Sequence, residues 1–101
     1  MNRHELITKA IYDAIGEVNG MLEPEQALEK SPDTILFGES GKLDSLAIVN
    51  LMIAVEEKIE RIFSRTVSLM DAVIAAENAR WTVAALANYI EERVELVGVG
   101  R

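Results

Sequence analysis

Apolar residues recur at intervals of three and four along this chain, and this spacing favours helices over strands. A first helix is expected to begin after Asn2, which has capping-box spacing to Glu5. It should end at Asn19-Gly20, because both residues tolerate the left-handed conformation of a helix end. Its apolar face comprises Ile7, Ala10, Ile11, Ala14, Ile15 and Val18.

A second helix is expected from Ser45 to about Ile62, and it is apolar on almost all sides. One stripe of its side chains is assigned to the core: Ile48, Leu51, Met52, Val55 and Ile59. A second stripe starts beside Ser45 and comprises Leu46, Val49 and Ile53. A small bundle can hardly bury both stripes, so the second is either a contact surface or part of a wide core face.

The two helices are joined by a long connection, residues 21–43, which Pro24 and Pro32 interrupt. A connection of this length in a small domain is usually either functional or disordered. Its apolar segment Ile35–Phe37 is expected to pin it onto the core and to keep it ordered.

The second half of the chain reads as a break at Phe63–Val67, a short third helix over Leu69–Ala76 and a last helix that starts at Thr82. Trp81 is interpreted as a core anchor. No substantial stretch of the sequence alternates apolar and polar residues, so no strand is expected. The predicted fold class is therefore all-α. Residues 1–101 form a single domain, a bundle of three main helices plus one short helix, with a long loop between the first and second helices.

Composition excludes several classes of function. The formal net charge of −7 repels phosphate backbones, so nucleic-acid binding is not expected. The same charge favours partners with basic patches, unless it serves solubility alone. The chain has no cysteine for disulfides or thiolate metal sites. Since we find neither a bilayer-spanning apolar run nor the apolar block of a secretory signal, we expect a cytoplasmic protein with no membrane span.

The best candidate site is Asp44-Ser45. Asp44 can cap the second helix, which places Ser45 on a first turn where free N–H groups and the helix dipole favour a phosphate. A serine hydrolase would need a base, but the only histidine is His4 and the Gly-x-Ser-x-Gly elbow is missing. No metal-ligand pattern has suitable spacing. We therefore expect no enzyme and no metal site, and interpret Ser45 as a site of modification.

The surroundings of this serine resemble the acyl carrier protein family. The motif Leu43-Asp44-Ser45-Leu46 follows a long loop and opens an apolar helix that runs into Val55-Glu56-Glu57-Lys58-Ile59. The closing Thr82-Val83, with Leu86 and Tyr89-Ile90, resembles the last helix of that family. The resemblance therefore spans nearly the whole chain.

The resemblance implies that Ser45 carries 4′-phosphopantetheine, which a phosphopantetheinyl transferase adds from coenzyme A. It also implies that Asp44 and Leu46 help the transferase to recognise the site. The thiol of the group would hold acyl intermediates as thioesters for acyl-transferring and acyl-modifying enzymes of lipid or specialised biosynthesis. The carrier itself is expected to be a monomer.

The resemblance further implies a face that binds basic patches on these enzymes. That face comprises Leu46, Val49, Ile53, Glu56 and Glu57. Two departures from the family favour a specialised carrier. Ala47 and Asn50 stand where many fatty-acid carriers have carboxylates, and the region Phe63–Trp81 is longer than usual. A peptidyl or aminoacyl carrier, and a helical adaptor without a prosthetic group, are the alternatives.

Overall fold

The computed structural model describes residues 2–38, 41–75 and 80–99 of the chain, without the side chains of residues 75 and 95–99. Helices make up most of the described chain, and two short strands add a small sheet. The helices are α1 (Arg3–Asn19), the 3-10 helix η1 (Pro24–Gln26), α2 (Ser45–Phe63), α3 (Met70–Ala75) and α4 (Val83–Val99). The strands are β1 (Ile35–Gly38) and β2 (Arg80–Thr82).

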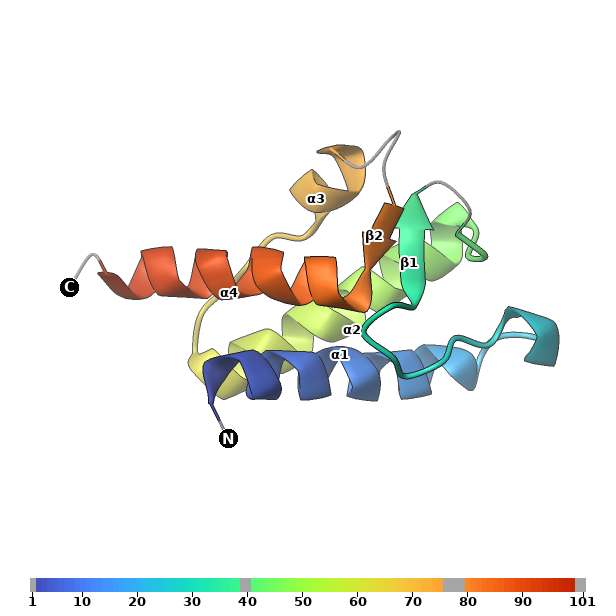
Figure 1. Ribbon diagram of the computed structural model, residues 1–101, viewed down its shortest axis with the longest axis horizontal. Coiled ribbons are helices and arrows are strands. Elements are labelled where there is room, and N and C mark those ends of the chain that lie inside the picture. The colour runs from blue at the N-terminus through green and yellow to red at the C-terminus, as the bar shows by residue number, and fades with distance from the viewer. Residues whose placement is uncertain (1, 39–40, 76–79, 100–101) are drawn as a thin grey trace.

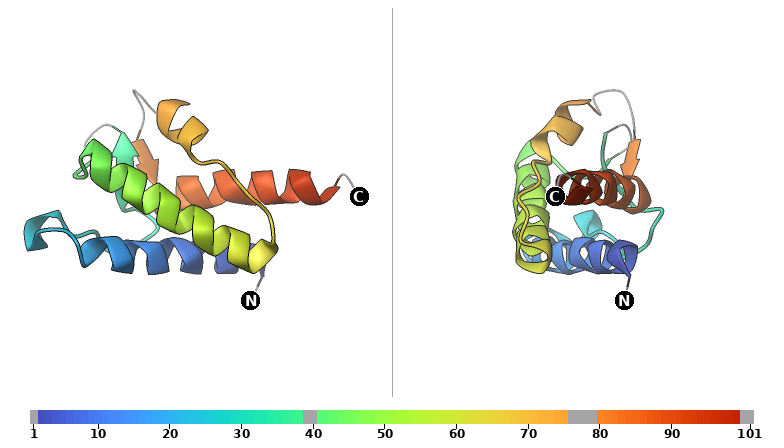
Figure 2. Two further views of the ribbon diagram at one scale, coloured as in Figure 1. Left: turned by 180° about the vertical axis from the view of Figure 1, so that it is seen from behind. Right: turned by 90° about the vertical axis from the view of Figure 1, so that its left-hand side faces the viewer.

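The three long helices surround the core. Helices α1 and α4 lie side by side and run in opposite directions, while α2 crosses behind both of them (Figure 1). Views from behind and from one end show α2 as a layer of its own against this pair (Figure 2). The small sheet lies at the end of the molecule where α2 begins, and the last turn of α2 lies beside the start of α1.

Helix α1 begins as expected but ends differently. The Glu5 N–H donates to Asn2 Oδ1 at 2.8 Å and the Asn2 N–H donates to Glu5 Oε1 at 3.3 Å, which confirms the capping box. All six residues of its predicted apolar face are buried. Gly20, however, has a φ of −65°, so the helix does not end on a left-handed residue. Instead, the Asn19 side chain bonds the backbone N–H and C=O of Leu28, at 2.8 and 2.9 Å, and so ties the connection to the helix end.

Helix α2 follows the sequence expectation closely. The core stripe is confirmed, since Leu51, Met52, Val55 and Ile59 are buried and Ile48 is half-buried. The helix ends at Ser64, whose φ of 56° is left-handed, so the predicted break after Phe63 is also confirmed.

The prediction of an all-α fold is wrong at one point, because β1 and β2 pair as an antiparallel sheet. Phe37 is paired with Trp81 and Gly38 with Arg80, with an irregularity between Ile35 and Phe37. Leu36 and Phe37 are buried, as expected of a segment that pins the connection onto the core. Buried backbone N–H and C=O groups need hydrogen-bond partners, and β2 supplies them.

The last two helices lie close to their predicted positions. Helix α3 begins one residue later than expected, and Ala76, its predicted last residue, lies outside the described residues. The Ala85 N–H donates to Thr82 Oγ1 at 3.1 Å, so Thr82 acts as the expected cap of α4. Within the described ranges, no helix combines the length and the apolar character that crossing a bilayer requires.

Candidate functional site

Ser45 is the first residue of α2, and its side chain is exposed. The helix is capped by its neighbour, because the Ala47 N–H donates to Asp44 Oδ1 at 2.8 Å. A cap of this kind is worth about 1 kcal/mol of stability. Ser45 Oγ makes no hydrogen bond within the part of the chain that the structure describes. The serine is therefore held in place by the helix start while its hydroxyl stays open to solvent.

The residues before Ser45 are held against the sheet. The Gly41 N–H donates to the Gly38 carbonyl at 3.1 Å. A Cβ at position 41 would lie 3.2 Å from that carbonyl oxygen and 3.3 Å from Phe37 Cα, so the close approach favours glycine. Leu43 is buried in the core cluster two residues later. The short approach to Ser45 is thus anchored at Gly41 and Leu43, while Lys42 and Asp44 are exposed.

His4 lies at the other end of the molecule. Its Nδ1 is 3.1 Å from Glu91 Oε1 on α4, so the imidazole joins the start of α1 to α4. The start of α1 lies beside the last turn of α2, whereas Ser45 is on its first turn (Figure 1). The structure therefore does not bring His4 and Ser45 together. Among the described residues, no group of three or more His, Cys, Asp and Glu side chains is placed to hold a metal ion.

The apolar residues of the predicted partner-binding face differ in exposure. Leu46 is 70% exposed and Ile53 is 49% exposed, while Val49 is half-buried. Two exposed apolar side chains on α3 were not anticipated from the sequence: Met70 at 39% and Ile74 at 71%. A contiguous apolar patch can mark a contact surface, and Leu46 and Ile53 are the exposed apolar members of the predicted face.

The two acidic residues of that face also differ from each other. Glu57 is exposed and makes no ion pair within the described ranges. Glu56 is half-buried, and its Oε2 accepts a hydrogen bond from the Leu69 backbone N–H at 2.7 Å. The Leu69 carbonyl in turn accepts bonds from Ala72 and Val73, so Glu56 fixes the residue just before α3. No sequence pattern indicated this contact.

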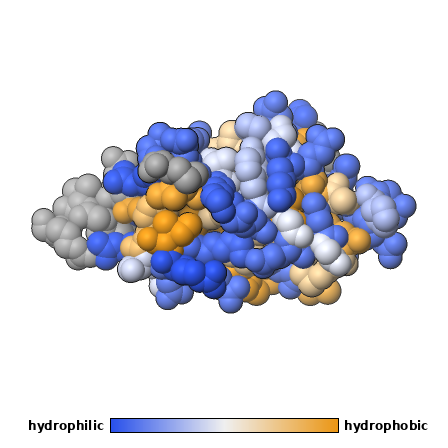
Figure 3. Space-filling view, turned by 90° about the horizontal axis from the view of Figure 1, so that it is seen from below, coloured by the Kyte–Doolittle hydropathy of each residue, from blue (hydrophilic) through white to orange (hydrophobic). Residues whose placement is uncertain are grey.

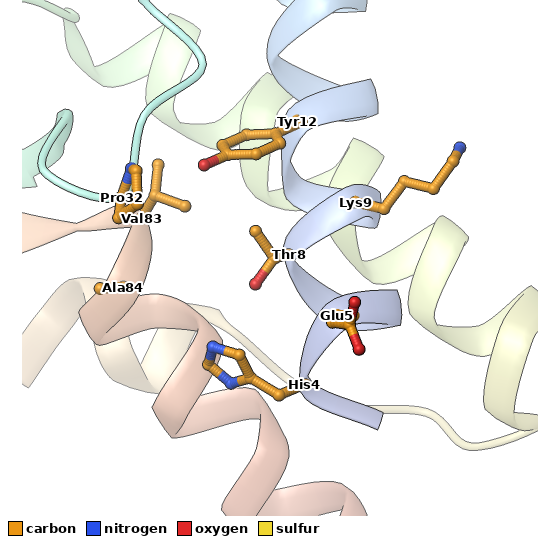
Figure 4. A pocket seen from close by; sticks show the side chains of 8 residues that line it. All are labelled: His4, Glu5, Thr8, Lys9, Tyr12, Pro32, Val83 and Ala84. Carbon is orange, nitrogen blue, oxygen red and sulfur yellow. The ribbon is translucent and has the colours of Figure 1, made fainter. Parts of the chain in front are cut away.

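A groove of about 400 Å³ lies between α1 and the start of α4 (Figure 4). It is lined by His4, Glu5, Thr8, Lys9, Tyr12, Pro32, Val83 and Ala84. None of the residues predicted for the site is among them. The face of the molecule seen from below is mostly hydrophilic, with apolar surface in separate patches (Figure 3). This groove is therefore separate from the candidate site at the start of α2.

No protein-family model matches this chain, and neither a curated protein nor a solved structure shows a match to it. The functional assignment therefore depends on the residues of the site. They define a class in physical terms: a small acidic helical protein with an exposed serine on a capped helix start, beside exposed apolar side chains.

Proposed function

We propose that this protein is an acyl carrier protein in which Ser45 carries 4′-phosphopantetheine, received from coenzyme A through a phosphopantetheinyl transferase. The observation that carries the proposal is the exposed hydroxyl of Ser45 on the first turn of α2. The thiol of the group would hold acyl intermediates as thioesters for enzymes of lipid or specialised biosynthesis. In this proposal the protein is a cytoplasmic monomer that serves as a substrate for enzymes.

Electrostatics at the start of α2 support an attached phosphodiester. Asp44 takes up the N–H of Ala47, whereas the N–H groups of Ser45 and Leu46 have no partner within the described residues. Free N–H groups and the positive end of the helix dipole both stabilise a phosphate on the first turn. The group would also bring the thiol that this cysteine-free chain lacks.

The packing of α2 bears on which kind of carrier this is. Ala47, at a position where many fatty-acid carriers have a carboxylate, is buried against the core. A carboxylate there would be removed from water without a partner, which is costly. The low acidity of the first turns of α2 therefore has a packing reason. Recognition of this carrier would depend more on Leu46 and Ile53, which supports a specialised pathway.

The proposal is tested by incubating the purified protein with coenzyme A and a broad-specificity phosphopantetheinyl transferase, then measuring its intact mass. We expect the mass to increase by one phosphopantetheine group and peptide mapping to place this group on Ser45. A reaction without transferase is the control. A protein that keeps its original mass, while a known carrier in the same tube is modified, would overturn the proposal. The mass of the protein isolated from its own cells distinguishes an acyl from an aminoacyl cargo.

The exposure of Leu46 and Ile53 also favours a second candidate, an adaptor that binds a partner through this face without a prosthetic group. For an adaptor, Ile53→Glu should weaken binding of a purified partner by at least about tenfold, because it places a charge in an apolar contact. Ser45→Ala should leave that binding unchanged, as measured by titration calorimetry. Ile74→Glu, at an exposed isoleucine on α3, is the matched control. If Ser45→Ala weakens binding as strongly as Ile53→Glu, the adaptor is excluded.

A further inference from the structure

A row of aromatic rings joins the two-stranded sheet to α4. Phe37 on β1 stacks on Trp81 of β2, with ring centroids 5.6 Å apart and an interplanar angle of 13°. Trp81 meets Tyr89 of α4 edge-on at 5.4 Å, and the Arg93 guanidinium lies 4.6 Å from the Tyr89 centroid. The row therefore joins β1 to α4 through side chains as well as through the backbone.

The same strand supports the approach to Ser45. Gly41 lies against the backbone of Phe37 and donates its N–H to Gly38, the last residue of β1. Only Lys42, Leu43 and Asp44 then separate Gly41 from Ser45. A displacement of β1 would therefore be transmitted to the start of α2 over a very short, partly buried segment.

The sheet is in turn fixed to the start of α4. The Val83 N–H donates to the Thr34 carbonyl at 2.9 Å, and the Ala84 N–H donates to the Pro32 carbonyl at 3.0 Å. These two bonds hold the connection just before β1 on the first turn of α4. Trp81 belongs to β2, stacks on Phe37 of β1 and meets Tyr89 of α4. It is thus a side chain that joins α4 to β1, the strand to which Gly41 is hydrogen-bonded.

We propose that the sheet positions Ser45 for attachment of the prosthetic group, and that Trp81 is the positioning residue. This inference rests on the proposed carrier function.

In the transfer, Ser45 Oγ bonds to the phosphorus that bears the pantetheine arm of coenzyme A. The bond from that phosphorus to its bridging oxygen breaks, adenosine 3′,5′-bisphosphate leaves, and the hydroxyl proton passes to a base of the transferase. Such a displacement requires Oγ in line with the leaving oxygen, so a loosely held serine reacts slowly.

The proposal assigns a role to the long region before the last helix. Residues between α2 and α4 include β2, and β2 contributes the ring that the stack needs. The extra length of this region, compared with common carriers, is then explained by the strand that clamps the approach to Ser45.

The test compares the rate of phosphopantetheine transfer to the wild type, Trp81→Ala and Trp81→Phe. For Trp81→Ala we expect kcat to fall by about tenfold or more with KM within about twofold, because Ser45 is misplaced while the docking face on α2 is intact. Trp81→Phe keeps a ring on Phe37 and should recover most of the rate. A variant that is merely less stable contains less folded substrate, so its apparent KM rises while kcat stays the same.

Two further measurements keep the test decisive. Amide hydrogen exchange of Gly41, Ala47 and Ile48, whose N–H groups donate to Gly38 and Asp44, should be faster in unmodified Trp81→Ala than in the wild type, and this readout does not require any transfer reaction. Tyr12→Ala, at a half-buried aromatic residue of α1 that lines the groove of Figure 4, is the control and should leave both readouts unchanged. Should Trp81→Ala fail to fold, Phe37→Leu removes the ring stack with a smaller change in volume.

A wild-type kcat for Trp81→Ala, a fall explained by KM alone, or unchanged exchange of the Gly41, Ala47 and Ile48 amides would overturn the inference. A wild-type protein that accepts no phosphopantetheine would overturn the proposed function instead. The exchange measurement would still report whether Trp81 holds the approach to Ser45. The two failures are therefore distinguishable.

Discussion

Replacing Ser45 by alanine is expected to abolish attachment of phosphopantetheine and to leave the fold unchanged. The attachment needs the hydroxyl oxygen, which alanine lacks, so the loss should be complete rather than partial. The fold should tolerate the change because Ser45 is exposed and its side chain makes no described hydrogen bond. The cap of α2 belongs to Asp44, and alanine is a better helix former than serine. We therefore expect the free energy of unfolding to change by less than about 0.5 kcal/mol.

Intact-mass measurement after the transferase reaction, together with urea unfolding, checks both halves of this prediction. Ser68→Ala is the matched control, since Ser68 is also exposed but lies in the segment before α3. It should be modified like the wild type. If Ser45→Ala still gains one group, the attachment point is another residue and the site assignment is wrong. If it unfolds at much lower urea, the loss of modification says nothing specific about the hydroxyl.

The helices of this protein could be predicted because their signals are local. The capping box of Asn2 and Glu5 and the cap supplied by Asp44 each act within three residues, so the sequence order alone places the bonds. The apolar face of α1 is continuous over the whole helix, and every residue assigned to it is buried. Periodicity over several turns is difficult to satisfy by chance.

The sheet could not be predicted because its cause is not local. β2 has only three residues, too few to show an alternating pattern, and β1 is a short apolar run. Their pairing joins Ile35 to Thr82, residues far apart in the sequence. The stack of Phe37 on Trp81 holds the two strands together, and neither ring indicates the other as its partner. Trp81 was expected in the core, but its specific place is on the sheet.

The candidate site divides in the same way. Ser45, Asp44 and Leu46 lie together because they are neighbours in one motif. The bond from Leu69 to Glu56 depends on the turn at Ser64, which brings the segment before α3 back onto α2. A glutamate on an exposed-looking helix face carries no signal of such a bond. The acidic side of the predicted face is therefore part of the protein's own structure as well as a candidate contact.

The two apolar stripes of α2 should differ sharply in their effect on stability. Leu51 is fully buried, so Leu51→Ala removes apolar contacts and leaves a cavity. We expect it to lower the free energy of unfolding by about 2–5 kcal/mol. Leu46 lies on the same helix but is 70% exposed, and Leu46→Ala should cost less than about 0.5 kcal/mol. Urea unfolding followed by circular dichroism measures both variants, which share residue type, helix and substitution.

Equal losses for the two variants would contradict the assignment of separate stripes and would make α2 a helix buried on all sides. The expected difference has a functional consequence. A large apolar side chain in water gives the folded protein little stability and increases the risk of aggregation. If folding does not depend on Leu46, this side chain next to Ser45 is free to serve another purpose. Contact with an enzyme that approaches Ser45 supplies one, because such a contact buries Leu46 only while the complex lasts.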